Sequence, residues 1–137
     1  MTRFELTELP IDVAALRREL DDPHCGAIAS FEGIVRDHND GRSVQRLEYQ
    51  SYADLAMREG QAIVDAIVAV SQARRVVCVH RVGMLAIGDV AVWVGVAAAH
   101  RGAAFEVCRH VIDQVKLRVP IWKNEHYADA SSGWIHP

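Results

Sequence analysis

Hydrophobic positions along the chain follow two spacings, one typical of helices and one typical of strands. Residues 54–71 place apolar side chains three or four positions apart, which predicts a helix lying on a sheet. The same spacing over residues 103–117 predicts a second long helix, which Pro120 ends. Between these segments, residues 90–99 are apolar at almost every position, which predicts a central strand buried on both faces.

Shorter segments complete the pattern. Strand-like runs lie at residues 4–9, 26–35, 44–52, 76–80 and 83–86. A polar stretch separates the second run from the third, which predicts a hairpin, and residues 10–20 predict a short helix with Pro10 in its first turn. Because strands and helices mix without a regular βαβ period, the predicted fold class is α+β with a largely antiparallel sheet, in a single domain over residues 1–137.

Composition narrows the possible functions. A net charge of -3 argues against general nucleic-acid binding, which needs a basic surface. The longest apolar run is too short to cross a bilayer, and the N-terminus lacks the layout of a signal peptide. Three widely separated cysteines, Cys25, Cys78 and Cys108, form no C-x-x-C pair and indicate reduced thiols in a cytoplasmic protein. No metal site is predicted, because the His-Cys pairs lack further spaced ligands.

The chain contains thirteen arginines but only two lysines, Lys116 and Lys123. Lysine can lose its proton when desolvated and then act as a base or nucleophile, whereas arginine stays charged. The two lysines are therefore candidate catalytic residues. Ordinary explanations stay open: Lys116 lies at helical spacing from Asp113 and can form a surface ion pair, and Lys123 beside Trp122 can extend from a strand toward water.

Two further positive clusters stand at predicted element ends. Arg36 closes a strand before the polar stretch, and His100 with Arg101 lies at the junction between the central strand and the following helix. Free backbone N–H groups and the helix dipole favour an anion such as phosphate at that junction. Arg36 as a solvated strand end, and His100 as a helix cap, are the alternatives.

Five segments carry a family resemblance. They are residues 31–39 (FEGIVRDHN), 80–83 (HRVG), 88–96 (GD followed by VGV), 99–106 (AHR with AFE) and, most distinctively, 116–125 (KLRVPIWKNE). Over about residues 26–134 the chain resembles the catalytic (large) subunit of molybdopterin synthase, the MoaE family. The resemblance implies an α/β-hammerhead fold and a homodimer of large subunits. One small ubiquitin-like subunit is expected at each end, which gives a heterotetramer.

The resemblance also implies a reaction. Sulfur from a thiocarboxylate on the small subunit's C-terminal Gly-Gly tail is transferred to cyclic pyranopterin monophosphate, forming the dithiolene of molybdopterin for molybdenum cofactor biosynthesis, without a metal or cofactor. Lys116 and Lys123 are then the expected catalytic residues. The expected substrate-binding residues are Arg36, His100 and Arg101 for the phosphate and pterin oxygens, and Ile34, Val35, Asn124 and Glu125 as pocket wall.

The main prediction is therefore a sulfurtransferase whose two lysines share one pocket with Arg36, His100 and Arg101, with a neighbouring subunit able to complete that pocket. Two other functions remain open at this point. One is a non-catalytic scaffold that binds the small subunit's Gly-Gly tail. The other is a phosphate-binding domain for a different small molecule.

Overall fold

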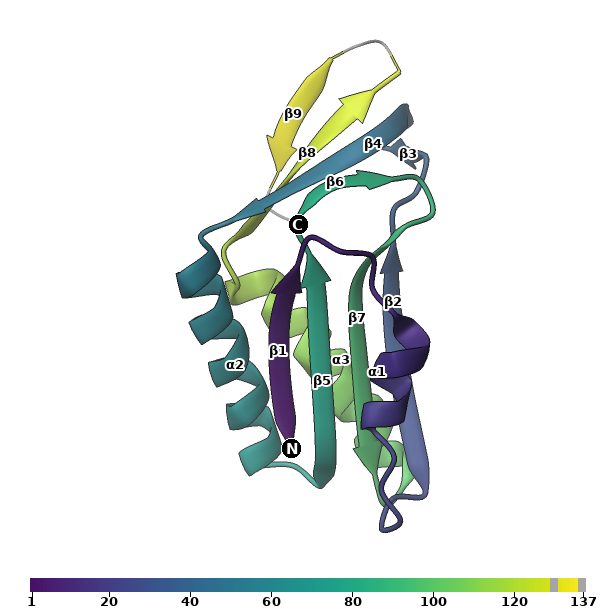
Figure 1. The fold of residues 1–137 in the computed structure, drawn as a ribbon, viewed down its shortest axis with the longest axis vertical. Helices are drawn as coiled ribbons and strands as arrows, with labels where there is room; N and C mark the ends of the chain where they lie inside the picture. The colour runs from purple at the N-terminus through teal and green to yellow at the C-terminus, as the bar shows by residue number, and fades with distance from the viewer. Residues whose placement is uncertain (129–130, 136–137) are drawn as a thin grey trace.

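The computed structural model describes residues 1–128 and 131–135 of the chain, and Figure 1 shows their arrangement. The elements in chain order are β1 (Thr2–Thr7), α1 (Val13–Glu19), β2 (Ala27–Ile34), β3 (His38–Asn39), β4 (Arg42–Ser51), α2 (Ala53–Ala69), β5 (Ala73–Arg81), β6 (Gly83–Ala86), β7 (Val90–Ala98), α3 (Arg101–Arg118), β8 (Ile121–Tyr127) and β9 (Ser132–Ile135). This mixture of helices and strands confirms the predicted α+β class.

The lower sheet in Figure 1 has the strand order β1-β5-β7-β2. Only β1 and β5 are parallel, and the other pairs of this sheet are antiparallel. Strand β7 lies inside the sheet and is buried from Ala91 to Ala98, as its apolar sequence predicts. The predictions of a largely antiparallel sheet and of a buried central strand are therefore confirmed.

Helices cover both faces of this sheet. Alternate residues of a strand point to opposite faces, so Val77 and Val79 of β5 join Trp93 and Leu20 in the cluster under α1. Val76 and Cys78 point the other way, into the larger cluster under α2 and α3. The core is thus built on two sides of one sheet, which keeps the ends of β2, β5 and β7 in fixed positions.

A second sheet crosses the upper end of the first, with strand order β3-β4-β8-β9 and β6 paired to β4. The long strand β4 pairs with β8 in an antiparallel register that sets Tyr49 opposite Lys123 and Leu47 opposite Glu125. Since partners in a pair point to the same face, all four side chains share one face. That face looks toward the end of the lower sheet.

The predicted hairpin between residues 26–35 and 44–52 is wrong. Strand β2 pairs with β7, and β4 pairs with β8 and β6, so the two strands belong to different sheets. Only the two-residue strand β3 folds back on β4, through a turn in which Asp40 and Gly41 have φ values of 49° and 75°. A register shift at Gly33/Ile34 ends β2's regular pairing, after which the chain leaves the lower sheet.

The helix ends follow local signals. Helix α1 begins after Asp12, whose side chain accepts a hydrogen bond from the Ala15 N–H at 3.0 Å, so Pro10 lies before the helix rather than in its first turn. Helix α3 ends at Arg118, and its C-cap residue Val119 is extended at φ −78° and ψ 129°, as expected before Pro120. None of the helices in the described ranges has the length and apolar character needed to span a membrane.

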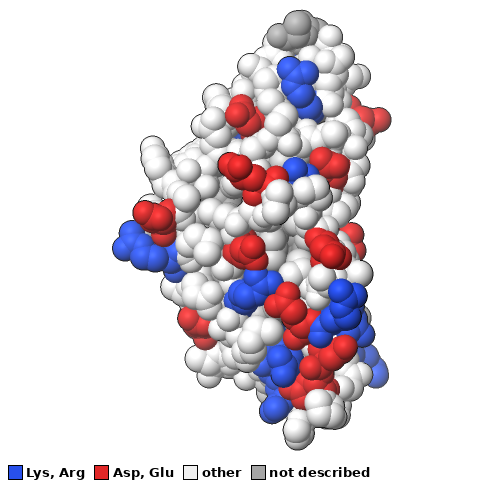
Figure 2. Space-filling view, viewed as in Figure 1, with Lys and Arg blue, Asp and Glu red and all other residues white. Residues whose placement is uncertain are grey.

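Figure 2 shows acidic and basic side chains mixed on this face, most of them over the lower half, with no large patch of one sign. Surface ion pairs in the described chain include Arg3 with Glu19 at 2.7 Å and Arg17 with Asp21 at 2.7 Å. This face therefore offers no extended basic surface of the kind that binds nucleic acid.

Candidate active site

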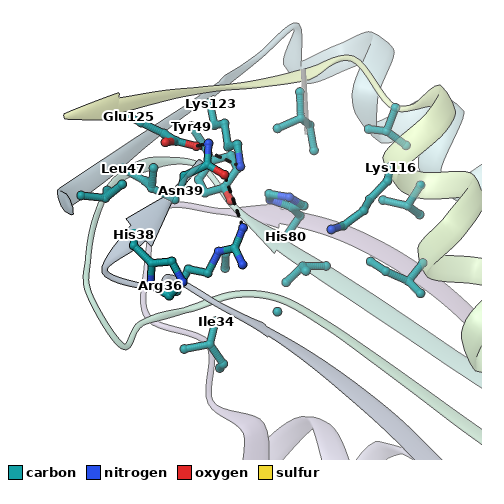
Figure 3. A pocket seen from close by; sticks show the side chains of 18 residues that line it. Ile34, Arg36, His38, Asn39, Leu47, Tyr49, His80, Lys116, Lys123 and Glu125 are labelled. Atoms are coloured by element: carbon teal, nitrogen blue, oxygen red, sulfur yellow. Dashed lines mark hydrogen bonds and ion pairs between the residues drawn. The ribbon is translucent and has the colours of Figure 1, made fainter. Parts of the chain in front are cut away.

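A cavity of about 230 Å³ lies where the two sheets meet the C-terminal end of α3. Strands β2, β5 and β7 form its floor, α3 forms one side, and β3, β4 and β8 form the roof. Figure 3 shows the side chains that line it. Segments that are far apart in the sequence thus contribute to one concave site.

Lys116 enters this cavity from the last turn of α3. Within the described chain, Lys116 has no ion pair, whereas Arg109 pairs with Asp113 at 3.6 Å on the outer side of the same helix. The alternative of a Lys116–Asp113 surface pair is therefore wrong. The lysine instead extends into the cavity, which Ile112 and Val115 of the same helix also line.

Lys123 comes from β8 and lines the same cavity as Lys116. Its ammonium lies 3.2 Å from Oε1 of Glu125, a carboxylate whose side chain is only 2% exposed. Asn39 donates a second hydrogen bond to that oxygen at 3.0 Å, and Arg36 donates to the Asn39 side-chain oxygen at 3.3 Å. A continuous polar chain therefore links Arg36 to Lys123 through a buried carboxylate, as the dashed lines in Figure 3 show.

The charge in the cavity is predominantly positive. Arg36, Lys116 and Lys123 contribute three cations against the single carboxylate of Glu125. An excess of fixed donors and positive charge in a concave site attracts anions and stabilises negative charge that develops during a reaction. The site therefore suits a phosphorylated or carboxylate-bearing ligand.

Two neutral polar residues, His80 and Tyr49, complete the wall, and sequence reasoning did not assign either to the site. Burial lowers the pKa of His80 to about 4, with a smaller contribution in the same direction from Lys116. Burial, together with the charge of Glu125, raises the pKa of Tyr49 to about 12. The rings pack edge to face, 5.0 Å apart. The HRVG segment and the β-strand pattern were the available signals for His80, but burial of a histidine next to a cavity is visible only in three dimensions.

The predicted wall residues separate according to strand alternation. Ile34 and Glu125 line the cavity, but Val35 and Asn124 do not. Val35 points into the core, where it is 2% exposed, and Asn124 points to the opposite face of β8 from Lys123 and Glu125.

His100 and Arg101 lie elsewhere on the chain. They stand at the N-terminal end of α3, sixteen and fifteen positions before Lys116, which is roughly 22–24 Å away along a helix that rises about 1.5 Å per residue. Neither lines the cavity, so a single chain brings together Arg36, Lys116 and Lys123 and leaves these two outside. Their contact with substrate stays a prediction.

In the part of the chain that the structure describes, no three His, Cys, Asp or Glu side chains gather closely enough to hold a metal ion. His38, the cavity histidine nearest the surface, instead contacts Asp37 at 2.9 Å. The cavity's donor-rich wall is suited to anions rather than to a cation.

Comparison with known proteins decides the family. The family model for MoaE protein matches residues 6–118. A molybdopterin synthase catalytic subunit from Nostoc sp. is 39% identical over 133 residues, which cover 96% of this chain and 81% of the relative. The chain belongs to the MoaE family.

Solved structures agree with this membership. Molybdopterin synthase from Staphylococcus aureus matches with a TM-score of 0.90 and 33% identity over 98% of both chains. A complex of subunits 1 and 2 of molybdopterin-converting factor from Helicobacter pylori matches with a TM-score of 0.77 over 97% of this chain and 88% of that chain; at 20% identity this second match concerns the fold alone. The predicted family, fold class and enzymatic role as a molybdopterin synthase catalytic subunit are confirmed.

Proposed function

We propose that the cavity between the two sheets is the place where this MoaE-family enzyme transfers sulfur to cyclic pyranopterin monophosphate. The observation that carries the proposal is that the chain's only two lysines, separated by a helix end and a proline, converge on one cavity with Arg36. In each transfer a substrate carbon exchanges its bond to oxygen for a bond to sulfur. The thiocarboxylate carbon exchanges its sulfur for oxygen, so no oxidant or reductant is consumed.

Each charged residue has a distinct task in this proposal. Arg36 binds the phosphate or a pterin oxygen through charge-assisted hydrogen bonds. Lys116, free of a described ion pair, faces the pterin or the incoming thiocarboxylate and stabilises its negative charge. Lys123 moves protons as oxygen leaves, while Glu125 holds its ammonium at 3.2 Å in a defined position.

The assembly expected from the family is also part of the proposal. A small sulfur-carrier subunit with a C-terminal Gly-Gly tail delivers the thiocarboxylate, and the Helicobacter pylori complex of the two subunits supports such a partner. A homodimer of large subunits brings His100 and Arg101 of one copy to the cavity of the other, giving a heterotetramer overall. Their distance from Lys116 within one chain supports this placement. The reaction is expected in the cytoplasm.

Reconstitution with the thiocarboxylated partner and quantification of the dithiolene product tests this function. Lys116→Ala and Lys123→Ala are each expected to lower turnover by more than hundredfold. Arg109→Ala, which removes an exposed cation from the same helix, is the matched control and keeps wild-type turnover. Wild-type turnover in both lysine variants refutes the proposal. Lys123→Arg separates the tasks, because arginine retains the charge but cannot give up a proton.

The buried carboxylate offers a second test. Glu125→Gln keeps the shape and an acceptor for Asn39 but removes the charge that holds Lys123. We expect turnover to fall at least tenfold, because Lys123 is no longer held in position. Partner binding is expected to stay unchanged, because the substitution does not alter the docking surface. Unchanged turnover contradicts the positioning role of Glu125 and leaves the lysine variants to decide the function.

A further inference from the structure

His80 lies in the middle of the cavity wall, and its ring orientation is fixed by two contacts. Nδ1 lies 2.7 Å from the Arg81 carbonyl oxygen, which can only accept, so Nδ1 carries the hydrogen. The ring also packs edge to face on Tyr49, with centroids 5.0 Å apart. The residue is 6% exposed. A buried ring held in this way has one defined tautomer and one defined direction.

This tautomer leaves Nε2 with a lone pair on the opposite side of the ring. Among the described residues, none forms a hydrogen bond with Nε2, and His80 lines the cavity between Arg36 and Lys116 (Figure 3). The charged side chains that line the cavity with it are Lys116 from α3, Arg36 after β2, and Lys123 and Glu125 from β8. Burial, with a smaller contribution from the charge of Lys116, disfavours a second proton on the imidazole. The histidine is therefore a neutral acceptor at neutral pH.

Few neutral side-chain acceptors line this cavity: besides His80 they are the exposed His38, the Tyr49 hydroxyl, and Asn39, whose oxygen already accepts from Arg36. Arginine and lysine side chains only donate, and of the two oxygens of the Glu125 carboxylate, Oε1 already accepts from Lys123 and Asn39 while Oε2 is buried. A ligand that carries only anionic groups has no use for a fixed neutral acceptor. A ligand that joins an anionic phosphate to a heterocycle with N–H donors needs both cationic donors for the phosphate and a neutral acceptor for the heterocycle.

We propose that His80 is a further substrate-contacting residue, whose Nε2 accepts a hydrogen bond from an N–H donor of the pterin ring while the cations bind the anionic groups. This inference rests on the proposed function and deepens it. It assigns recognition of the heterocycle to β5, a strand of the lower sheet, and recognition of charge to α3, β8 and the segment after β2. His80 thereby selects a pterin over other phosphorylated compounds of similar size.

The direct test is ¹⁵N NMR of the imidazoles in the full wild-type chain, saturated with partner that lacks the thiocarboxylate so that no turnover occurs. Without substrate, Nε2 of His80 has the resonance of an unprotonated nitrogen. Adding cyclic pyranopterin monophosphate is expected to shift that resonance to lower frequency, because Nε2 then accepts a hydrogen bond. A Nε2 resonance that does not move when the substrate saturates the site overturns the inference. Absence of any substrate binding or conversion by wild type instead refutes the proposed function itself.

Two substitutions give an independent readout. His80→Asn can keep the donor to the Arg81 carbonyl but loses the acceptor at Nε2, whereas His80→Gln can place an oxygen near the Nε2 position. We expect the Kd for the substrate to rise roughly tenfold in His80→Asn and less in His80→Gln, as for one lost neutral hydrogen bond. His110→Asn, an exposed histidine on α3 outside the cavity, is the control.

Structural effects are separated by measuring the thermal unfolding midpoint and partner affinity of each variant. A folded His80→Asn protein with wild-type substrate affinity overturns the inference. The inference is also overturned if both variants lose the same affinity for substrate and this loss only parallels their loss of thermal stability. That pattern indicates that His80 is a core residue without contact to substrate.

Discussion

Burial of His80 has a consequence for stability that depends on pH. The pKa of this histidine is lowered from 6.5 to about 4, first by burial and secondarily by the charge of Lys116. The unfolded chain therefore binds a proton as the pH falls through about 6.5, while the folded chain resists binding it until about pH 4. Folding stability is fully present above pH 6.5 and declines as the pH falls toward 4.

The magnitude follows from the size of the shift. Each pKa unit corresponds to about 1.4 kcal/mol, so a shift from 6.5 to about 4 amounts to about 3 kcal/mol when the whole window has been crossed. Between pH 7 and pH 5 the expected loss is about 2 kcal/mol. Because the residue is only 6% exposed, solvent does not screen this cost substantially. A loss of this size is a large fraction of the stability of a typical domain.

Urea unfolding at pH 7 and pH 5 measures the effect. His80→Gln does not titrate, so its free energy of unfolding is expected to change by about 2 kcal/mol less than that of wild type between the two pH values. His110→Gln, on the exposed side of α3, is the matched control and keeps the wild-type dependence. The lowered pKa of Asp22 has its effect only below about pH 4 and so lies outside this window. Equal pH dependence in His80→Gln and wild type refutes the reasoning.

Two further predictions concern the core. In Gly60→Ala, an added Cβ comes within 2.2 Å of the Phe4 ring, so we expect a loss of about 1–3 kcal/mol despite the better helix propensity of alanine; a thermal midpoint at or above that of wild type contradicts this. Burial raises the pKa of the Cys78 thiol to about 12, so iodoacetamide at pH 8 should modify half-buried Cys25 and reach Cys78 only in urea. Detection by mass spectrometry of alkylated Cys78 in protein treated without urea contradicts the second prediction.

Most of the elements were predictable because each depends on local spacing, but β3, β8 and β9 were not among the predicted strands. The buried run that became β7, and the helix that Pro120 ends, followed from apolar periodicity and from the backbone limits of proline. Pairing was less predictable. Residues 26–35 and 44–52 have strand-like side chains, but the side-chain pattern of a strand does not specify which strand pairs with it. In the structure β2 pairs with β7, and β4 pairs with β8.

The candidate site shows the same division between local and long-range information. Composition singled out Lys116 and Lys123, and both line the cavity. Alternate residues of β8 face opposite sides of the sheet, so Glu125 faces the cavity and Asn124 does not. The amino-acid composition gives no information about this register. His100 and Arg101 failed to join the cavity within one chain for a comparable reason, since an eighteen-residue helix separates its two ends by more than any side chain can span.

His80 is the residue for which sequence reasoning had least to offer, and its chemistry depends most on the surrounding structure. Its proton position is set by a carbonyl of the neighbouring residue, its neutrality by burial and secondarily by Lys116, and its access to the cavity by the meeting of two sheets. None of these is a property of histidine alone. A cavity built only from lysine and arginine attracts any anion of suitable size, so discrimination among phosphorylated compounds requires a neutral group with a fixed direction. The fold provides that group on β5, the strand next to the one that the apolar pattern marked as the centre of the sheet.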